Sequence, residues 1–173
     1  KEEYRERIDR AVFPGLQGGP HNNVIAAIAQ MAFEAAQPEF KKYQRQILAN
    51  AQALAENLKL LNFKLLTDGT KNHMMLIDLK SYNMGGKGKE AQDLLEQAGI
   101  VVNRNSIPGD TSPFNPSGLR VGTPAVTTRG MKEKEMKKIA EWFKRVLITK
   151  ESPEKIKVEV EGLCRQFPLP YKV

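Results

Sequence analysis

A loop rich in proline and glycine, at residues 106–118, restricts the fold more than any other stretch of this chain. Its turn-forming residues are Pro108, Gly109, Pro113, Pro116 and Gly118. Proline lacks a backbone donor and blocks a helix interior, so the loop can form neither a helix nor a central strand. Ordered loops of this length commonly carry function. We therefore expect a stiff, irregular connection that encloses part of a binding site.

The residues after this loop predict a short strand with one arginine on its open face. In Leu119-Arg120-Val121-Gly122 the side chains alternate, so Leu119 and Val121 point to one face and Arg120 to the other. A guanidinium offers two parallel donors that match a carboxylate or a phosphate. Arg120 is therefore a candidate anion-binding residue. A structural salt bridge, or an exposed place on a solvated strand face, is the alternative.

Composition excludes several classes of protein. With 173 residues, 40% of them hydrophobic, the chain can bury the core of one domain, or of one domain and a piece of another. No apolar run approaches the roughly 18 residues of a membrane span, so we expect no membrane partner. The single cysteine, Cys164, excludes an internal disulfide and favours a reducing compartment. We expect a cytoplasmic protein, with an organelle such as the mitochondrion as the alternative.

Charge and histidine content argue against two further kinds of site. The net charge of +7 raises the question of nucleic-acid binding, but the basic residues at 132–138 alternate with glutamates, which is typical of a solvated helix face. No nucleic-acid-binding motif accompanies them, so we expect no nucleic-acid partner. His21 and His73 do not form a metal-ligand pattern, and we expect no metal.

Hydrophobic periodicity predicts an alternation of helices and short strands. The expected helices are residues 2–12, 24–36, 38–61, 91–98, 136–147 and 153–167. The expected strands are residues 63–66, 74–79, 100–102 and 119–122, of which the first two form an antiparallel hairpin. Three or four short strands, partly antiparallel, with helices on one side, define the expected fold class as α/β, in the form of an α+β layer.

Local signals refine this picture. Asn22 or Asn23 is expected to cap the helix at 24–36, and Thr127-Thr128 the helix at 136–147. The glycine-rich residues 84–88 are interpreted as a mobile linker. The helix at 24–36 is apolar almost all round, which predicts burial in a core or an interface.

Three segments of the chain carry a family resemblance. They are Phe-Pro-Gly-Leu-Gln-Gly-Gly-Pro-His at residues 13–21, Gly-Thr-Lys-Asn-His at residues 69–73, and Asn-Ser-Ile-Pro-Gly-Asp with Ser-Gly-Leu-Arg-Val-Gly-Thr-Pro-Ala within residues 105–125. In this order the segments resemble serine hydroxymethyltransferase. That family comprises pyridoxal-phosphate enzymes that interconvert serine and glycine with tetrahydrofolate.

The resemblance implies a fold, a division of the chain and a set of site residues. Residues 1–36 would be a helical remnant of the large cofactor domain, and residues 37–173 the small C-terminal domain of a fold-type I pyridoxal-phosphate enzyme. The implied binding residues are Arg120 for the serine or glycine carboxylate, Gly18 and Gly19 for the cofactor phosphate of the neighbouring subunit, and Asn105, Ser112, Pro113 and Phe114 for folate.

The resemblance also implies a catalytic lysine in a Thr-His-Lys-Thr segment before the Phe-Pro-x-x-Gln-Gly-Gly loop, and these residues contain no such segment. We therefore assign no catalytic residue here, and interpret the chain as the C-terminal part of a longer enzyme that is inactive alone. The alternative is a non-catalytic paralogue, or a module for assembly or ligand binding. The apolar helix at 24–36 further predicts a homo-oligomer, a dimer or larger.

Overall fold

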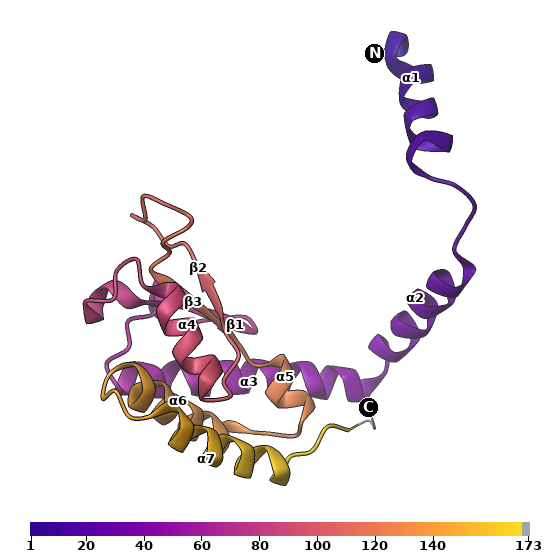
Figure 1. Cartoon of the computed structure of the whole chain (residues 1–173). Coiled ribbons are helices and arrows are strands. Elements are labelled where there is room, and N and C mark those ends of the chain that lie inside the picture. Colours follow the sequence, from indigo (N-terminus) through magenta and orange to yellow (C-terminus); the bar gives the residue numbers. More distant parts are fainter. Residues whose placement is uncertain (171–173) are drawn as a thin grey trace. The chain divides into compact units, whose positions relative to one another are not determined.

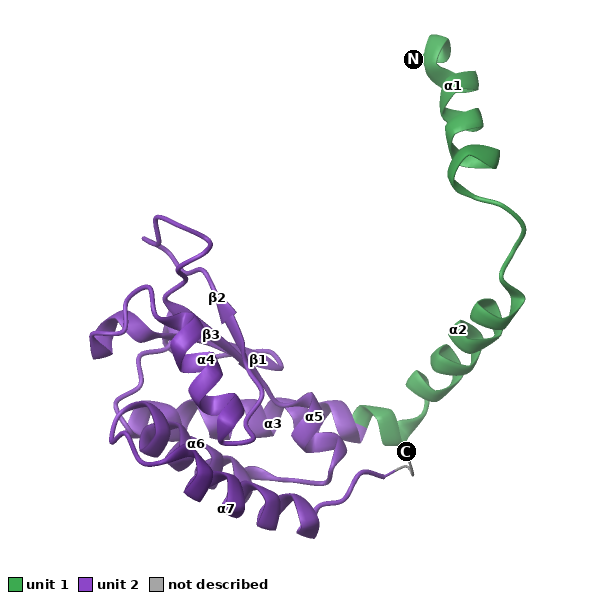
Figure 2. Ribbon diagram, in the orientation of Figure 1, with its two compact units in different colours: residues 1–41 green, residues 42–173 purple. Residues whose placement is uncertain are grey.

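The computed structural model describes residues 1–170. It divides the chain into two compact units, Lys1–Lys41 and a second that begins at Lys42 (Figure 2). The predicted assignment of residues 1–36 to a large domain and of residues 37–173 to a small one stays a prediction.

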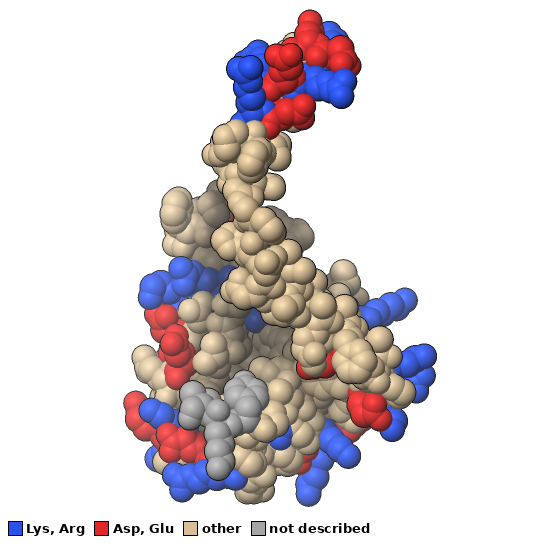
Figure 3. Space-filling view, turned by 90° about the vertical axis from the view of Figure 1, so that its right-hand side faces the viewer, with Lys and Arg blue, Asp and Glu red and all other residues tan. Residues whose placement is uncertain are grey.

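Unit 1 is helical and irregular. It contains a 3-10 turn at Glu2–Tyr4, α1 at Arg5–Arg10, a π-type turn at Ala11–Leu16 and α2 at Asn22–Ala35. Acidic and basic side chains are mixed on the first helix, as expected for an amphipathic segment (Figure 3). The predicted asparagine cap of α2 is wrong, because Asn22 is already the first helical residue and His21 precedes it without a side-chain cap.

The apolar side chains of α2 are not covered within unit 1. Five of them expose between 50% and 65% of their surface: Val24, Ile25, Ile28, Met31 and Phe33. The sequence has no charged residue between Arg10 and Glu34, and Figure 3 shows the segment as an uncharged stretch. The helix forms as predicted, but its predicted burial is not found in the described residues. A helix that is apolar all round needs partners on several sides, and unit 1 supplies none.

Helix α3, at Pro38–Leu60, forms the base of unit 2. Its buried residues Ile47, Ala51, Leu54 and Leu58 recur every three or four positions. This confirms the predicted apolar seam, which packs into the hydrophobic core of its own domain. Proline at the first helical position is tolerated because its missing donor would have had no partner there.

Unit 2 contains one antiparallel sheet, formed by β1 (Met74–Asp78), β2 (Asn103–Asn105) and β3 (Gly118–Gly122) in the order β1-β3-β2. The predicted strand at 63–66 is wrong, since only an isolated bridge joins Leu65 to Ile77. The chain leaves the sheet there through a 3-10 turn at Leu66–Asp68.

The predicted strand at 100–102 is displaced to Asn103–Asn105. Gly99 ends the preceding helix with a positive φ of 79°, and the Ile100 N–H then donates to the Leu95 carbonyl at 2.8 Å. Residue 100 is thereby bound to the helix end, so strand pairing starts three residues later.

Helices cover one face of this sheet (Figure 1). They are α3, α4 (Gly88–Gln97), α6 (Glu133–Leu147) and α7 (Pro153–Gln166), with the short α5 (Pro124–Thr128) after β3. Strand residues Met75, Ile77, Leu119 and Val121 join the helices in the core. The described part of unit 2 therefore forms an α/β domain with a three-stranded antiparallel sheet, in agreement with the predicted class.

The predicted cap at Thr127-Thr128 is wrong. Thr127 and Thr128 belong to α5, and α6 begins after Lys132, whose N–H donates to the Glu135 carboxylate at 2.9 Å. Residues 84–88 form a turn with buried ends, and their mobility stays a prediction. Met84 is 4% exposed, and a Cβ on Gly88 would lie 2.6 Å from the Pro116 carbonyl oxygen.

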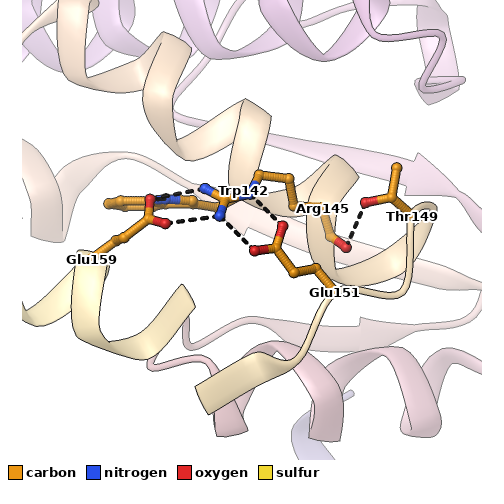
Figure 4. A network of polar contacts seen from close by, with 5 residues as sticks. All are labelled: Trp142, Arg145, Thr149, Glu151 and Glu159. Carbon is orange, nitrogen blue, oxygen red and sulfur yellow. Dashed lines mark hydrogen bonds and ion pairs between the residues drawn. The ribbon is translucent and has the colours of Figure 1, made fainter. Parts of the chain in front are cut away.

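A polar network joins α6 to α7 (Figure 4). The Arg145 guanidinium donates to both oxygens of Glu151 and to both oxygens of Glu159, each at 2.8 Å, and the Trp142 indole also donates to Glu159. Hydrogen bonds from Arg145, and then from Trp142, lower the pKa of Glu159 to about 2. The network therefore favours the ionised carboxylate and fixes the contact between the two helices.

Candidate functional site

Arg120 lies in the middle of the sheet, on the face away from the helices. In the central strand β3 it pairs with Leu76 of β1 and with Asn103 of β2. Its neighbours Leu119 and Val121 are 0% and 7% exposed, whereas Arg120 is exposed. The predicted alternation is confirmed, and pairing on both sides fixes the backbone from which the guanidinium extends.

The Arg120 side chain has no ion pair and no hydrogen bond to any of residues 1–170. The salt-bridge alternative thus lacks an acidic partner in the described part of the chain. The exposed guanidinium keeps its donors available for an anion.

Polar and apolar side chains share this open face. Asn103 and Asn105 alternate onto the same side as Arg120, and Leu76 stands beside it on β1. A groove beside β1 is lined by residues 66–67, 69–72 and 74–76 together with Pro108. Because Leu76 lies beside Arg120, the segment Gly69-Thr70-Lys71-Asn72 shares this groove with a neighbour of Arg120.

The side chains of that segment build its own turn. The Thr70 hydroxyl donates to the Met74 carbonyl at 2.5 Å, and the Asn72 side-chain oxygen accepts from the Met74 N–H at 2.9 Å. The His73 carbonyl accepts from the Thr123 N–H at 3.0 Å, while its ring is exposed. His73 thus acts in the structure through its backbone.

The β2–β3 loop is closed at its base by a carboxylate that the sequence did not reveal. One Asp110 oxygen accepts from the N–H groups of Ile107 (3.0 Å) and Ser117 (2.9 Å), which lie on opposite limbs of the loop. The other oxygen is 3.0 Å from the Lys80 ammonium. We call these four residues the Asp110 clip. The available signal was the Pro-Gly-Asp sequence, because aspartate after a turn often bonds to nearby backbone N–H groups.

The Asp110 carboxyl is held in its ionised form. Its side chain is 4% exposed, yet a hydrogen bond from the Ser117 side chain lowers its pKa far below the usual value for aspartate. The backbone N–H groups of Ile107 and Ser117 and the Lys80 ammonium act in the same direction, against the opposing effect of burial.

The four residues predicted to bind folate lie at two separate positions, one at the end of β2 and three at the tip of the loop. Asn105 is at the base, in β2 opposite Gly118. Ser112, Pro113 and Phe114 are at the tip, where the Ser112 hydroxyl oxygen accepts from the Phe114 N–H at 3.2 Å. No hydrogen bond joins Asn105 to the tip within residues 1–170. The Phe114 ring is 87% exposed.

Gly18 and Gly19 belong to unit 1, in the segment before α2. A Cβ placed on either glycine would meet no atom within 4 Å. Neither backbone N–H donates a hydrogen bond among residues 1–170. Both donors are therefore open to an external group.

Two features are absent from residues 1–170. No group of three or more histidine, cysteine, aspartate or glutamate side chains in this range could hold a metal ion. None of its helices is long and apolar enough to cross a membrane.

The fold and the open face together define a class: an α/β domain, backed by helices, that presents an unpaired arginine and a clipped loop on an antiparallel sheet. The family model for serine hydroxymethyltransferase matches residues 1–143. A protein of Sorangium cellulosum (strain So ce56) named serine hydroxymethyltransferase is 51% identical over 174 residues, which cover 98% of this chain and 41% of that protein. The chain belongs to the serine hydroxymethyltransferase family.

Proposed function

We propose that this chain is the C-terminal part of a pyridoxal-phosphate-dependent serine hydroxymethyltransferase that interconverts serine and glycine with tetrahydrofolate. On this proposal, unit 2 is the small domain of a fold-type I enzyme. The observation that carries the proposal is the exposed Arg120 guanidinium, which has no partner in residues 1–170 and stands beside the β2–β3 loop.

In this function Arg120 binds the carboxylate of serine or glycine. Its two parallel N–H donors match the two carboxylate oxygens, so the contact fixes orientation as well as position. The paired strand holds the backbone of Arg120, and Leu76 and Asn103 flank it on the open face. Arg120 therefore orients the bonds at the α-carbon of the amino acid.

The β2–β3 loop supplies the surface for folate. The Phe114 ring is exposed and offers an apolar face on which an aromatic ring system can stack. Asn105 and Ser112 provide an amide and a hydroxyl for hydrogen bonds, and Pro113 stiffens the tip. These four side chains would line the path of the tetrahydrofolate molecule.

The residues of unit 1 fit a phosphate group. Gly18 and Gly19 lack side chains that would block close approach, and their N–H groups are free within residues 1–170. They precede the N-terminus of α2, where the helix dipole favours an anion. We assign to them the phosphate of pyridoxal phosphate bound in the neighbouring subunit. When bound, this cofactor supplies a ring that withdraws electrons from the α-carbon of the amino acid.

The proposed enzyme is a homo-oligomer, a dimer or larger. The supporting observation is α2, whose apolar side chains are uncovered in unit 1. Association with a second copy would remove this surface from water.

The direct test is glycine formation from serine by the full-length protein that carries this chain, with tetrahydrofolate and pyridoxal phosphate added. Glycine production that requires both additions supports the proposal. A full-length protein that binds serine but forms no glycine would favour a non-catalytic paralogue.

A further inference from the structure

We propose that Lys80 and Asp110 are positioning residues, which hold the β2–β3 loop in the shape that binds folate without contacting folate themselves. This inference rests on the proposed function. Its observations are the contacts at the base of the loop and the absence of comparable contacts at the tip.

The first observation is that one carboxylate ties together both limbs of the loop. Asp110 bonds to the N–H of Ile107, just after β2, and to the N–H of Ser117, just before β3. The Asp110 N–H also donates to the Ile107 carbonyl at 3.0 Å. A single side chain thus sets the distance between residues that are ten positions apart.

The second observation is that Lys80 anchors this carboxylate to the neighbouring connection. Lys80 lies in the 3-10 helix Leu79–Tyr82, directly after β1. Its ammonium contacts Asp110 at 3.0 Å and donates to the Pro108 carbonyl at 2.9 Å. The Lys80 N–H in turn donates to Asp78 at 2.9 Å. The loop is therefore bound to β1 as well as to its own strands.

Side chain and backbone are tightly packed at the base of the β2–β3 loop. The Ile107 side chain is 6% exposed, and a Cβ on Gly118 would lie 2.3 Å from one of its methyl groups. Gly118 thus allows Ile107 to pack directly on the backbone of β3. The clip therefore fixes the base of the loop, and the rest of the loop extends beyond β2 and β3 (Figure 1).

The third observation is that the tip has only local bonds of its own. Within residues 111–115, the hydrogen bonds run from the N–H groups of Phe114 and Asn115 back to Ser112. Within residues 1–170, no hydrogen bond from another element reaches Ser112, Pro113 or Phe114. Their direction therefore depends on the base of the loop, where the clip acts beside the backbone bonds that Gly88 donates to Pro116 (2.8 Å) and Leu79 donates to Ser117 (2.9 Å). Arg120 does not share this dependence, because strands pair with it on both sides.

This difference predicts that loss of the clip affects the binding of the two ligands unequally. Loss of the clip makes the tip sample other conformations, and folate must then reorder the loop when it binds. The carboxylate of serine still meets Arg120 on an intact sheet. A change at Lys80 or Asp110 should therefore weaken the binding of tetrahydrofolate and leave serine binding nearly unchanged.

The experiment compares Asp110→Asn, Lys80→Met and the double variant in the full-length enzyme, and measures dissociation constants for serine and for tetrahydrofolate separately. Lys89→Met is the matched control, because Lys89 forms an exposed ion pair with Asp93 in α4. We expect each single variant to raise the Kd for tetrahydrofolate roughly tenfold and the Kd for serine less than twofold. Because Lys80 and Asp110 act as a unit, the double variant should lose no more than Asp110→Asn alone.

Two results would overturn the inference. One is a Kd for tetrahydrofolate that stays at the wild-type value in Asp110→Asn. The other is a parallel rise of both Kd values, which indicates a general structural role. Failure of the proposed function looks different, since the wild-type enzyme itself would then form no glycine from serine and tetrahydrofolate.

Discussion

Arg145 and Glu159 form a two-pronged ion pair between α6 and α7, with both N–O distances at 2.8 Å. Their side chains are 32% and 37% exposed, so solvent weakens the pair without removing it. Arg145→Met should lower the free energy of unfolding by about 1–2 kcal/mol, because Glu151 and Glu159 lose a shared partner. Urea unfolding of this chain measures the change.

The matched control for this variant is Arg165→Met, since Arg165 is 81% exposed and lies 3.8 Å from Glu161. That change should leave stability nearly unaltered. Equal losses in the two variants would mean that the network does not fix the α6–α7 contact.

The same network predicts a dependence of stability on pH. The folded-state pKa of Glu159 is about 2, below the value of about 4.3 for an unfolded glutamate. A lowered folded-state pKa contributes stability that is present above the unfolded value and lost as pH falls through the folded one. The free energy of unfolding should therefore decline from about pH 5 towards pH 2, and less steeply in Glu159→Gln. Identical slopes in wild type and variant would contradict this assignment.

The turn at residues 84–88 gives a sharp test of packing. Gly88→Ala should destabilise the chain by about 1–3 kcal/mol, because the new Cβ would meet the Pro116 carbonyl oxygen at 2.6 Å. Gly85→Ala is the control, since its Cβ would be 3.7 Å from the nearest atom, in the Lys80 side chain. Thermal unfolding of both variants measures the difference. A tolerated alanine at residue 88 would instead support the interpretation of this segment as a mobile linker.

The apolar face of α2 predicts self-association. Sedimentation of this chain at tens of micromolar should reveal dimers or larger species, and Ile28→Glu should shift them towards monomer by placing a charge on the uncovered face. Ile8→Glu in α1 provides a comparison outside α2. A wild-type monomer without dye-binding apolar surface would count against this prediction.

Local periodicity predicted much of the fold. The seam of α3 and the alternation around Arg120 depend on neighbours one to four residues apart, which the sequence displays directly. The prediction of a strand at 63–66 was wrong because Thr67 and Asp68 adopt positive φ and turn the chain away from the sheet. The prediction of a cap at Thr127-Thr128 was wrong because these residues end the short helix α5, which the hydrophobic periodicity does not reveal.

Only part of the candidate site could be predicted from the sequence. Arg120 and the loop could be identified from alternation and from proline content. The Pro-Gly-Asp turn offers a signal for Asp110, but its ion pair with Lys80 could not be predicted, because Lys80 lies thirty positions away and the pairing depends on how β1 and β3 meet. Contacts between distant parts of the chain depend on the tertiary structure. The periodic pattern of a single sequence shows only which near neighbours share a face.

The most direct test of the central claim is serine affinity in the full-length enzyme, followed by the spectral change of the bound cofactor, for wild type, Arg120→Lys and Arg120→Ala. Arg104→Lys is the control, since Arg104 alternates onto the other face of the sheet. Arg120→Lys keeps the charge but loses the two-pronged contact, so serine binding should weaken by about 1.5–3 kcal/mol, and more in Arg120→Ala. The melting temperature should stay constant, because Arg120 has no partner in residues 1–170. Unchanged serine affinity together with a melting temperature several degrees lower would contradict the account and make Arg120 a structural residue.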